Sequence, residues 1–313
     1  MSVILFLVLI VQKQFDVTDI IESKFEMIDG IFLSALEVSE SQSPCVIVLH
    51  LHANSFTNII YTSYARSLAS NGAVVCLLNL RGNGSSEGSK GRVDYVGQLE
   101  SDVHEVLKQL RDKYPNARVV LSGHSGGSAI CLRYFNQFDT KDISGLILLA
   151  PIIQPHPEAS RYDMPGSAVL KLFKPRQYEK KELPEDKRGQ LPKVFVFRIF
   201  LAWLIPLLRN ITTVEFPKNG EVHKGRTFSF SYKTMKNYGI ENYKKTFNDI
   251  QIPVFTSIGT DDDVTLPKFI DDLCFKYFGN QPNSEWHLIE GSNHSNIVRK
   301  SQRKVISWLN NIT

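Results

Sequence analysis

The sequence predicts an α/β fold, in which helices flank a mostly parallel central sheet and a helical cap is inserted late in the chain. Short β-type runs alternate with helix-type segments, which is the pattern of a parallel sheet covered on both faces. The alternation stops between Ala150 and Pro253 and then resumes, which indicates an insertion. The length of 313 residues suits one large domain with a sizeable core.

The first half of the chain carries most of the predicted sheet. It opens with an antiparallel hairpin, because Asp29-Gly30 separates two apolar β-type runs. Buried strands and helices then follow one another. In order, the hairpin strands are expected at Phe25–Met27 and Ile31–Val38, further strands at Cys45–His50, Ala73–Asn79, Ala117–Ser122 and Ser144–Ala150, and helices at Ile60–Ser70, Val96–Lys113 and Ser125–Phe135.

The second half completes the sheet after the insertion. Strands are expected at Pro253–Ile258 and Glu285–Ile289, and a helix at Arg299–Asn310 closes the chain. The predicted organisation is therefore an apolar N-terminal segment at 1–24, a first core part at 25–151, the cap at 152–250, and a second core part at 251–313.

Composition and charge exclude several function classes. The net charge of +4 is small for this length, so a nucleic-acid partner is not expected. The four cysteines lie far apart and form no CxxC pair, which argues against a zinc site or a disulfide framework. No metal and no cofactor are therefore expected.

The N-terminus leaves the compartment open. Val3–Val11 is unbroken apolar sequence, but nine residues are too few to span a bilayer as a helix. No basic region precedes it and no signal-peptidase-like site follows it. A shortened signal-anchor and a helix packed on the body both fit, so the localisation is either cytoplasmic or membrane-associated.

The strongest local signal is Gly123–Gly127 (GHSGG), which lies directly between an apolar strand and a helical run. G-x-S-x-G at such a junction is typical of a nucleophile elbow, in which small neighbours let the chain turn sharply and expose the serine hydroxyl. Ser125 is thus the candidate nucleophile. The amide of Gly126, in the first turn of the helix, is a candidate donor to an oxyanion.

Serine is a weak nucleophile and needs a base and an acidic residue that orients the base. After such an elbow these residues follow in the order Asp then His, each from a loop after a later strand. His294 comes in a Gly-led loop directly after the last predicted strand and is the candidate base. The triplet Asp261–Asp263 follows the preceding strand and supplies the candidate acid.

A second motif carries a resemblance to a known family. Asn79–Gly88 (NLRGNGSSEG) resembles the D-x-R-G-x-G-x-S-x-G loop of the monoacylglycerol lipase and lysophospholipase branch of α/β-hydrolases, often labelled serine aminopeptidase S33-like. Ser229–Tyr243 is similar to the return from the cap in some of its bacterial members. The resemblance implies the α/β-hydrolase fold and the cleavage of small-molecule or lipid esters. It also favours Asp262 as the acid, since it stands third after Gly259 as in the family's G-x-x-D loop, with Asp263 as the alternative.

The chain departs from the family pattern at two positions. The family's His-Gly after the first parallel strand reads His50-Leu51 here, and by position the second oxyanion donor is then the amide of His52. Leu51 lacks the conformational freedom of glycine, so the oxyanion hole is expected to be reshaped. Asn79 replaces the usual Asp, for which only a structural consequence is expected.

The cap contains the apolar run Val194–Leu208 (VFVFRIFLAWLIPLL). One interpretation is a helix buried on all sides. The other is a segment that lines an acyl-chain tunnel or touches a lipid surface, with Phe200 and Trp203 as candidate substrate-binding residues. The N-terminal segment and the cap are the two candidate places for peripheral membrane contact.

The sequence thus predicts a serine hydrolase that cleaves carboxylic esters of monoacyl lipids through an acyl-enzyme. An acyltransferase, a thioesterase or an aminopeptidase with the same triad remains an alternative, the last requiring a cap carboxylate such as Glu179, Glu182 or Glu185 to bind the substrate amine. A non-catalytic binding protein on the same fold is a further alternative, because a fold alone does not establish a function.

Overall fold

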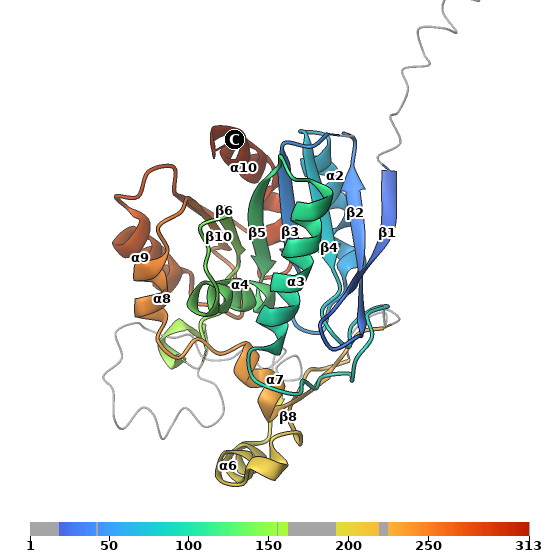
Figure 1. Cartoon of the computed structure of the whole chain (residues 1–313). Helices are drawn as coiled ribbons and strands as arrows, with labels where there is room; N and C mark the ends of the chain where they lie inside the picture. The colour runs from blue at the N-terminus through green and yellow to red at the C-terminus, as the bar shows by residue number, and fades with distance from the viewer. Residues whose placement is uncertain (1–18, 42, 155, 162–191, 219–224, 313) are drawn as a thin grey trace, which may run out of the picture.

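A computed structural model describes residues 19–41, 43–154, 156–161, 192–218 and 225–312. Its centre is an eight-stranded sheet in the order β1-β2-β4-β3-β5-β6-β10-β11 (Figure 1). The pairs β1–β2 and β2–β4 are antiparallel, and the other five pairs are parallel. The strands are β1 (Asp19–Glu26), β2 (Phe32–Ser39), β3 (Val46–Leu51), β4 (Ala73–Leu78), β5 (Arg118–His124), β6 (Ile143–Leu149), β10 (Val254–Gly259) and β11 (Glu285–Ile289).

Apolar side chains bury both faces of the sheet under helices. In β3, Ile47 and Leu49 belong to the core on one face, whereas Val46 and Val48 belong to the core on the other. Helices α3, α4, α8 and α9 cover the first face, and α2 and α10 cover the second. These helices are α2 (Thr62–Ala69), α3 (Gln98–Lys113), α4 (Gly126–Gln137), α8 (Tyr243–Asp249), α9 (Pro267–Phe278) and α10 (Ile297–Ile312), and short 3-10 turns occupy Asn58–Tyr61 and Pro157–Ala159.

The sequence predicts a helical cap after β6. The described part of this insertion differs from the prediction, because it also contains strands. It contains a three-stranded antiparallel sheet of β7 (Lys193–Val194), β8 (Thr212–Glu215) and β9 (Ser229–Ser231). Two helices accompany it, α6 (Val196–Leu204) and α7 (Tyr232–Asn237). In Figure 1 β8, α6 and α7 lie beyond one end of the parallel strands, with α6 at the outer tip.

The apolar cap run does not form the single helix that was one interpretation of it. Helix α6 ends at Leu204, and a 3-10 turn, Pro206–Leu208, follows. Pro206 has no amide hydrogen and disfavours a helical conformation in the residue before it. Accordingly Ile205 has extended backbone angles, with φ of −115° and ψ of 103°.

Two elements differ from the prediction, and two predicted features lie outside the described residues. Strand β1 begins at Asp19 rather than near Phe25, and α9 was not predicted. The apolar segment Val3–Val11 and the three cap glutamates fall outside the described ranges. No helix within those ranges combines the length and apolar character that a bilayer crossing requires.

Candidate active site

Ser125 occupies a sharp turn between β5 and α4. Its backbone angles are φ 53° and ψ −116°, a strained conformation for a residue with a side chain. Two glycines make the turn feasible. A Cβ on Gly123 would lie 2.4 Å from the carbonyl carbon of Gly127, and one on Gly127 would lie 2.1 Å from the carbonyl oxygen of Leu51. The GHSGG motif therefore forms the elbow that its spacing predicted.

Ser125, His294 and Asp262 form one hydrogen-bonded chain. The Ser125 hydroxyl donates to Nε2 of His294 at 2.8 Å, and Nδ1 of His294 donates to Oδ2 of Asp262 at 2.8 Å. Asp262 is fully buried, whereas Ser125 and His294 are each 8% exposed. This is the geometry in which an imidazole can take the serine proton while a carboxylate fixes its tautomer.

Of the three neighbouring aspartates, the structure brings Asp262 to the histidine. Its other oxygen, Oδ1, accepts the amides of Val264 at 2.9 Å and Thr265 at 2.7 Å. Asp261 is exposed and Asp263 is partly exposed. Every oxygen of the Asp262 carboxylate thus has a partner, which fixes its orientation toward His294.

Glycine also allows the acid and base loops to approach each other. Gly259 ends β10, and a Cβ there would lie 1.9 Å from the carbonyl oxygen of Ser292 in the histidine loop. The amide of Asp261 donates to the same carbonyl at 2.9 Å. The close approach of these main chains brings the two side chains within hydrogen-bonding distance.

The surroundings of the histidine raise its pKa. Burial alone would lower the pKa of His294, but the negative charge of Asp262 and its hydrogen bond outweigh burial, and the charge of Asp263 adds to them. For Asp262, burial acts to raise the pKa, and the charge and hydrogen bond of His294 together with two backbone amides lower it overall. The pair therefore favours an ionised carboxylate beside a basic imidazole.

A pH dependence follows, because only the neutral imidazole can accept the serine proton. Turnover of a soluble ester should be full at high pH and should fall as one proton is taken up, with a midpoint above the roughly 6.5 of an unperturbed histidine. A profile of kcat/KM against pH measures this midpoint. Asp263→Asn should move it to lower pH, since that charge helps to raise the pKa of His294. A wild-type midpoint below 6.5 would contradict the assigned base.

Gly126 and His52 lie together beside the nucleophile. Gly126 is the first residue of α4 and has no helical carbonyl four residues before it, so its amide is one of the unpaired donors of a helix N-terminus. The main chain of His52 packs against the same turn, because a Cβ on Gly127 would lie 2.9 Å from its carbonyl oxygen. A Cβ on Gly126 would lie 2.0 Å from Oδ1 of Asn54, so the carboxamide of Asn54 fills the space of a side chain at 126.

The imidazole of His52 is occupied with holding the main chain. Its Nδ1 donates to the carbonyl of Ala53 at 2.8 Å, and its Nε2 accepts the amide of Leu80 at 3.1 Å. Burial lowers the pKa of His52 to about 4. The side chain is thus neutral at physiological pH, and only the main-chain amide of His52 can serve an oxyanion.

A buried pair that the sequence analysis did not identify connects this loop to the base. The hydroxyl of Tyr61 accepts the amide of Ala53 at 2.9 Å and donates to Nδ1 of His124 at 2.9 Å. Nε2 of His124 then donates to the carbonyl of His294 at 2.8 Å. Burial, aided by the charge of His294, lowers the pKa of His124 to about 3. His124, the second residue of GHSGG, therefore positions the loops as a neutral group, for which the sequence held no signal beyond its place in the motif.

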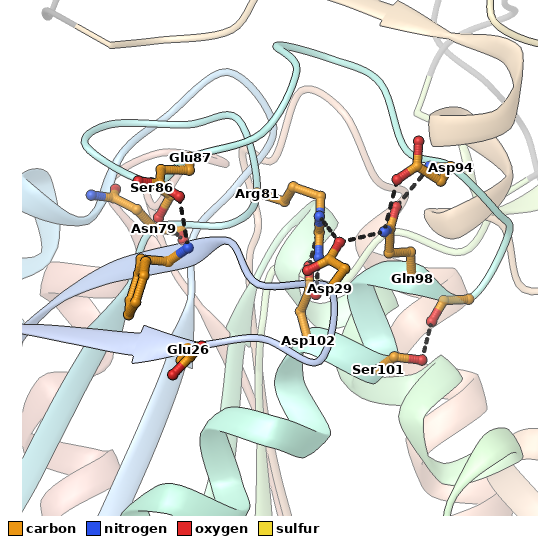
Figure 2. A network of polar contacts seen from close by, with 12 residues as sticks. Glu26, Asp29, Asn79, Arg81, Ser86, Glu87, Asp94, Gln98, Ser101 and Asp102 are labelled. Carbon is orange, nitrogen blue, oxygen red and sulfur yellow. Dashed lines mark hydrogen bonds and ion pairs between the residues drawn. The ribbon is translucent and has the colours of Figure 1, made fainter.

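The second motif serves as a scaffold, as Figure 2 shows. Arg81 donates two hydrogen bonds to the buried carboxylate of Asp102, at 2.9 Å and 2.6 Å, and a third to Asp29 at 2.6 Å. The Arg81 hydrogen bond lowers the pKa of Asp29 against the effect of burial. Asn79 accepts the amide of Asn58 and donates to Ser34, so its carboxamide forms structural contacts on both sides.

The predicted substrate-binding aromatics belong to the cap helix α6. Phe200 and Trp203 are 52% and 63% exposed on α6, and their ring centroids are 6.1 Å apart. Ala202 is the one buried residue of this helix. The structure therefore disagrees with a helix buried on all sides, and the roles of Phe200 and Trp203 in substrate binding stay predictions.

Among the residues that the structure describes, no three His, Cys, Asp or Glu side chains gather as a metal site requires. The hydrogen-bonded chain can carry out acyl transfer with its own side chains.

Comparisons with known proteins agree with this fold. A protein of Monkeypox virus named monoglyceride lipase homolog is 22% identical over 261 residues, which is 80% of this chain and 84% of the viral protein. A soluble variant of the Saccharomyces cerevisiae monoglyceride lipase has a TM-score of 0.66 at 20% identity, with 96% of this chain and 98% of that chain covered. A carboxyl esterase from Bacillus coagulans has a TM-score of 0.64 at 17% identity, with 94% and 98% covered.

The family assignment rests on a match along most of the sequence. The model of the family described as serine aminopeptidase, S33, matches residues 42–298. This range includes the elbow, the acid loop and the histidine loop. The chain therefore belongs to the serine aminopeptidase S33 family of hydrolases.

Proposed function

We propose that the protein hydrolyses carboxylic esters of monoacyl lipids, such as monoacylglycerols or lysophospholipids, through an acyl-enzyme. The observation that carries the proposal is the chain of two 2.8 Å hydrogen bonds from Ser125 through His294 to the buried Asp262. This chain lies at an elbow beside two candidate oxyanion donors. An ester carbonyl between the hydroxyl and these donors would meet both a nucleophile and a stabiliser of its negative charge.

The geometry supports a two-step reaction. In the first step Ser125 attacks the carbonyl carbon while His294 takes its proton and then gives it to the leaving alcohol. The amides of Gly126 and His52 hold the oxyanion, and Asp262 stabilises the charged imidazole. In the second step a water molecule, activated by the same histidine, releases the fatty acid and restores the serine.

The substrate class rests on the relatives. Both the viral relative and the yeast structure are named monoglyceride lipases, and the structure from Bacillus coagulans is named an esterase. Peptidase action would need a carboxylate that binds a free amine, and the three glutamates considered for it lie outside the described residues. Labelling with a fluorophosphonate and an ester series of increasing acyl length test the proposal. Absence of both labelling and ester turnover would refute it.

The exposed face of α6 supports contact with a lipid surface. This face, here called the cap ridge, presents large apolar side chains to solvent. Helix α6 itself lies at the outer tip of the described cap elements (Figure 1). Such a surface is costly in water and is typical of a site that meets a partner or a membrane. The ridge also takes in Leu207 of the following 3-10 turn. It consists of Val196, Phe197, Phe200, Trp203, Leu204 and Leu207, which are 52% to 93% exposed.

Phe200→Asp and Trp203→Asp are expected to weaken turnover of long-chain substrates in vesicles by about tenfold or more, because burial of one such side chain contributes roughly 1.5–3 kcal/mol. Turnover of a short soluble ester should stay unchanged, since both rings are exposed on α6 and neither takes part in the hydrogen-bonded chain from Ser125 to Asp262. Both residues are exposed, so the melting temperature should change little. A kcat/KM series from C2 to C16 beside a thermal melt measures these effects.

Phe275→Asp provides the matched control, because this ring is 73% exposed on α9, outside the cap. It should leave the chain-length series as in the wild type. An equal loss on short and long esters in the two ridge variants would contradict the lipid-contact role.

A further inference from the structure

The turn that follows β3 is strained. Ala53–Phe56 forms a β-turn that the amide of Phe56 closes by donating to the carbonyl of Ala53 at 3.1 Å. Ser55, the third residue of this turn, has a φ of 62°, in the left-handed region that favours glycine. Its buried hydroxyl has no hydrogen-bond partner among the described residues. The Ser55 side chain therefore adds no hydrogen bond that offsets the strained φ. Contacts made by the main chain of the turn must maintain this conformation instead.

The same turn determines where the candidate oxyanion donor lies. The carbonyl of Ala53 that closes the turn also accepts the Nδ1 hydrogen of His52 at 2.8 Å. Asn54, the second residue of the turn, packs its carboxamide against Gly126. A relaxation at Ser55 would therefore move the peptide that follows His52 and the Asn54 carboxamide that contacts Gly126.

Arg226 reaches this turn from the cap. Its Nε hydrogen is donated to the carbonyl oxygen of Ser55. Its guanidinium carbon lies 5.1 Å from the centre of the Phe56 ring, in the turn, and 4.8 Å from that of Phe228, in the cap. A guanidinium placed over two rings, with a directed hydrogen bond from its Nε, is an arrangement that lysine does not reproduce.

The segment around Arg226 is itself tied to the hydrolase core. The carbonyl of Gly225 accepts the amide of Gly84 at 2.9 Å, and the hydroxyl of Thr227 donates to the carbonyl of Gly82 at 2.8 Å. Both acceptor and donor belong to the loop that Arg81 anchors. The residues directly before and after Arg226 are thus both bonded to the core. Arg226 therefore contacts Ser55 from a segment whose position is fixed.

We infer that Arg226 is a positioning residue, which keeps the strained turn at Ser55 in place and so fixes the His52 amide beside the nucleophile. The inference rests on the proposed ester hydrolysis and on the oxyanion role of His52. It couples the cap to the catalytic step through the return segment 225–228 rather than through the cap ridge.

The test is Arg226→Gln, assayed on p-nitrophenyl butyrate. This soluble ester needs no membrane contact. A misplaced oxyanion donor weakens binding of the transition state, so kcat should fall roughly tenfold to a hundredfold while KM changes less than about twofold. The control is Arg198→Gln, because Arg198 also donates to a carbonyl and stacks on a ring, at Thr212 and Phe195, but wholly within the cap. This control should keep the wild-type kcat.

A second substitution separates positioning from general damage. Ser55→Gly should retain near wild-type kcat, because glycine adopts a φ of 62° without strain. In the double variant of Arg226→Gln with Ser55→Gly, most of the lost kcat should return, since the turn then needs no external support. A purely structural loss would appear as a lowered melting temperature and would not be rescued in this way.

Three outcomes would overturn the inference: an unchanged kcat in Arg226→Gln, a raised KM with unchanged kcat, or no recovery in the double variant. The second of these would make Arg226 a substrate-binding residue instead. Failure of the proposed function itself would appear differently, as the absence of ester turnover in the wild type.

Discussion

Ser125→Ala is expected to abolish ester turnover and to leave the fold intact. The serine hydroxyl makes its hydrogen bond to His294, and the β-carbon that remains keeps the same strained backbone. Without the nucleophile no acyl-enzyme forms, and the remaining rate should be lower by several orders of magnitude, up to about 10⁶-fold. Steady-state kcat on a soluble ester and labelling by a fluorophosphonate measure the loss.

Ser295→Ala is the matched control for this substitution. Ser295 directly follows the candidate base, is exposed, and lies outside the hydrogen-bonded chain. It should keep wild-type labelling and turnover. If Ser125→Ala still reacts with the fluorophosphonate at the wild-type rate, another residue is the nucleophile.

The parallel sheet could be predicted because its strands carry their own signal. A strand buried on both faces is a largely apolar run. β3, β4 and β6 read this way over most of their length, and β5 does so over Val119–Leu121. Once the order of strands is known, loops at their carboxyl ends must meet at one edge. This is why Ser125, Asp262 and His294 could be proposed together although up to 169 residues separate the serine from the histidine.

The features that the sequence could not provide depend on contacts between distant segments. The bond of Tyr61 to His124 joins residues 63 positions apart, and that of Arg226 to Ser55 joins residues 171 apart. Neither pair has a local pattern. The environment of the cap run could not be predicted for another reason. The apolar sequence of Val194–Leu208 fits a buried helix as well as an exposed one. The three-dimensional structure is needed to show that Phe200 and Trp203 are exposed to solvent.

Strand β1 and helix α9 show a different limit. β1 pairs as an edge strand through residues 19–26, where charged and polar residues alternate with a few apolar ones, so its beginning was not evident. α9 buries Phe269, Ile270 and Leu273 on one side, and a Pro at its first position marks its start. The sequence therefore does carry a signal for this helix.

Asp262→Asn is expected to lower turnover by roughly 10⁴-fold, and the structure specifies why. In the wild type Oδ1 of Asp262 accepts the amides of Val264 and Thr265, while Oδ2 accepts the Nδ1 hydrogen of His294. An asparagine must keep its oxygen toward the two amides, so its NH₂ group faces Nδ1. The imidazole then carries its hydrogen on Nε2 and cannot accept the proton of Ser125.

The neighbouring aspartates provide the comparison that tests this argument. Asp261→Asn and Asp263→Asn should each cost about tenfold or less in kcat/KM, because neither carboxylate contacts Nδ1 of His294. All three variants are measured on the same soluble ester, together with thermal melts. A larger loss in Asp263→Asn than in Asp262→Asn would move the acid by one residue and would contradict the hydrogen-bonded chain. It would still leave Ser125 and His294 to transfer the acyl group, because the nucleophile and the base act on the carbonyl whichever carboxylate orients the imidazole.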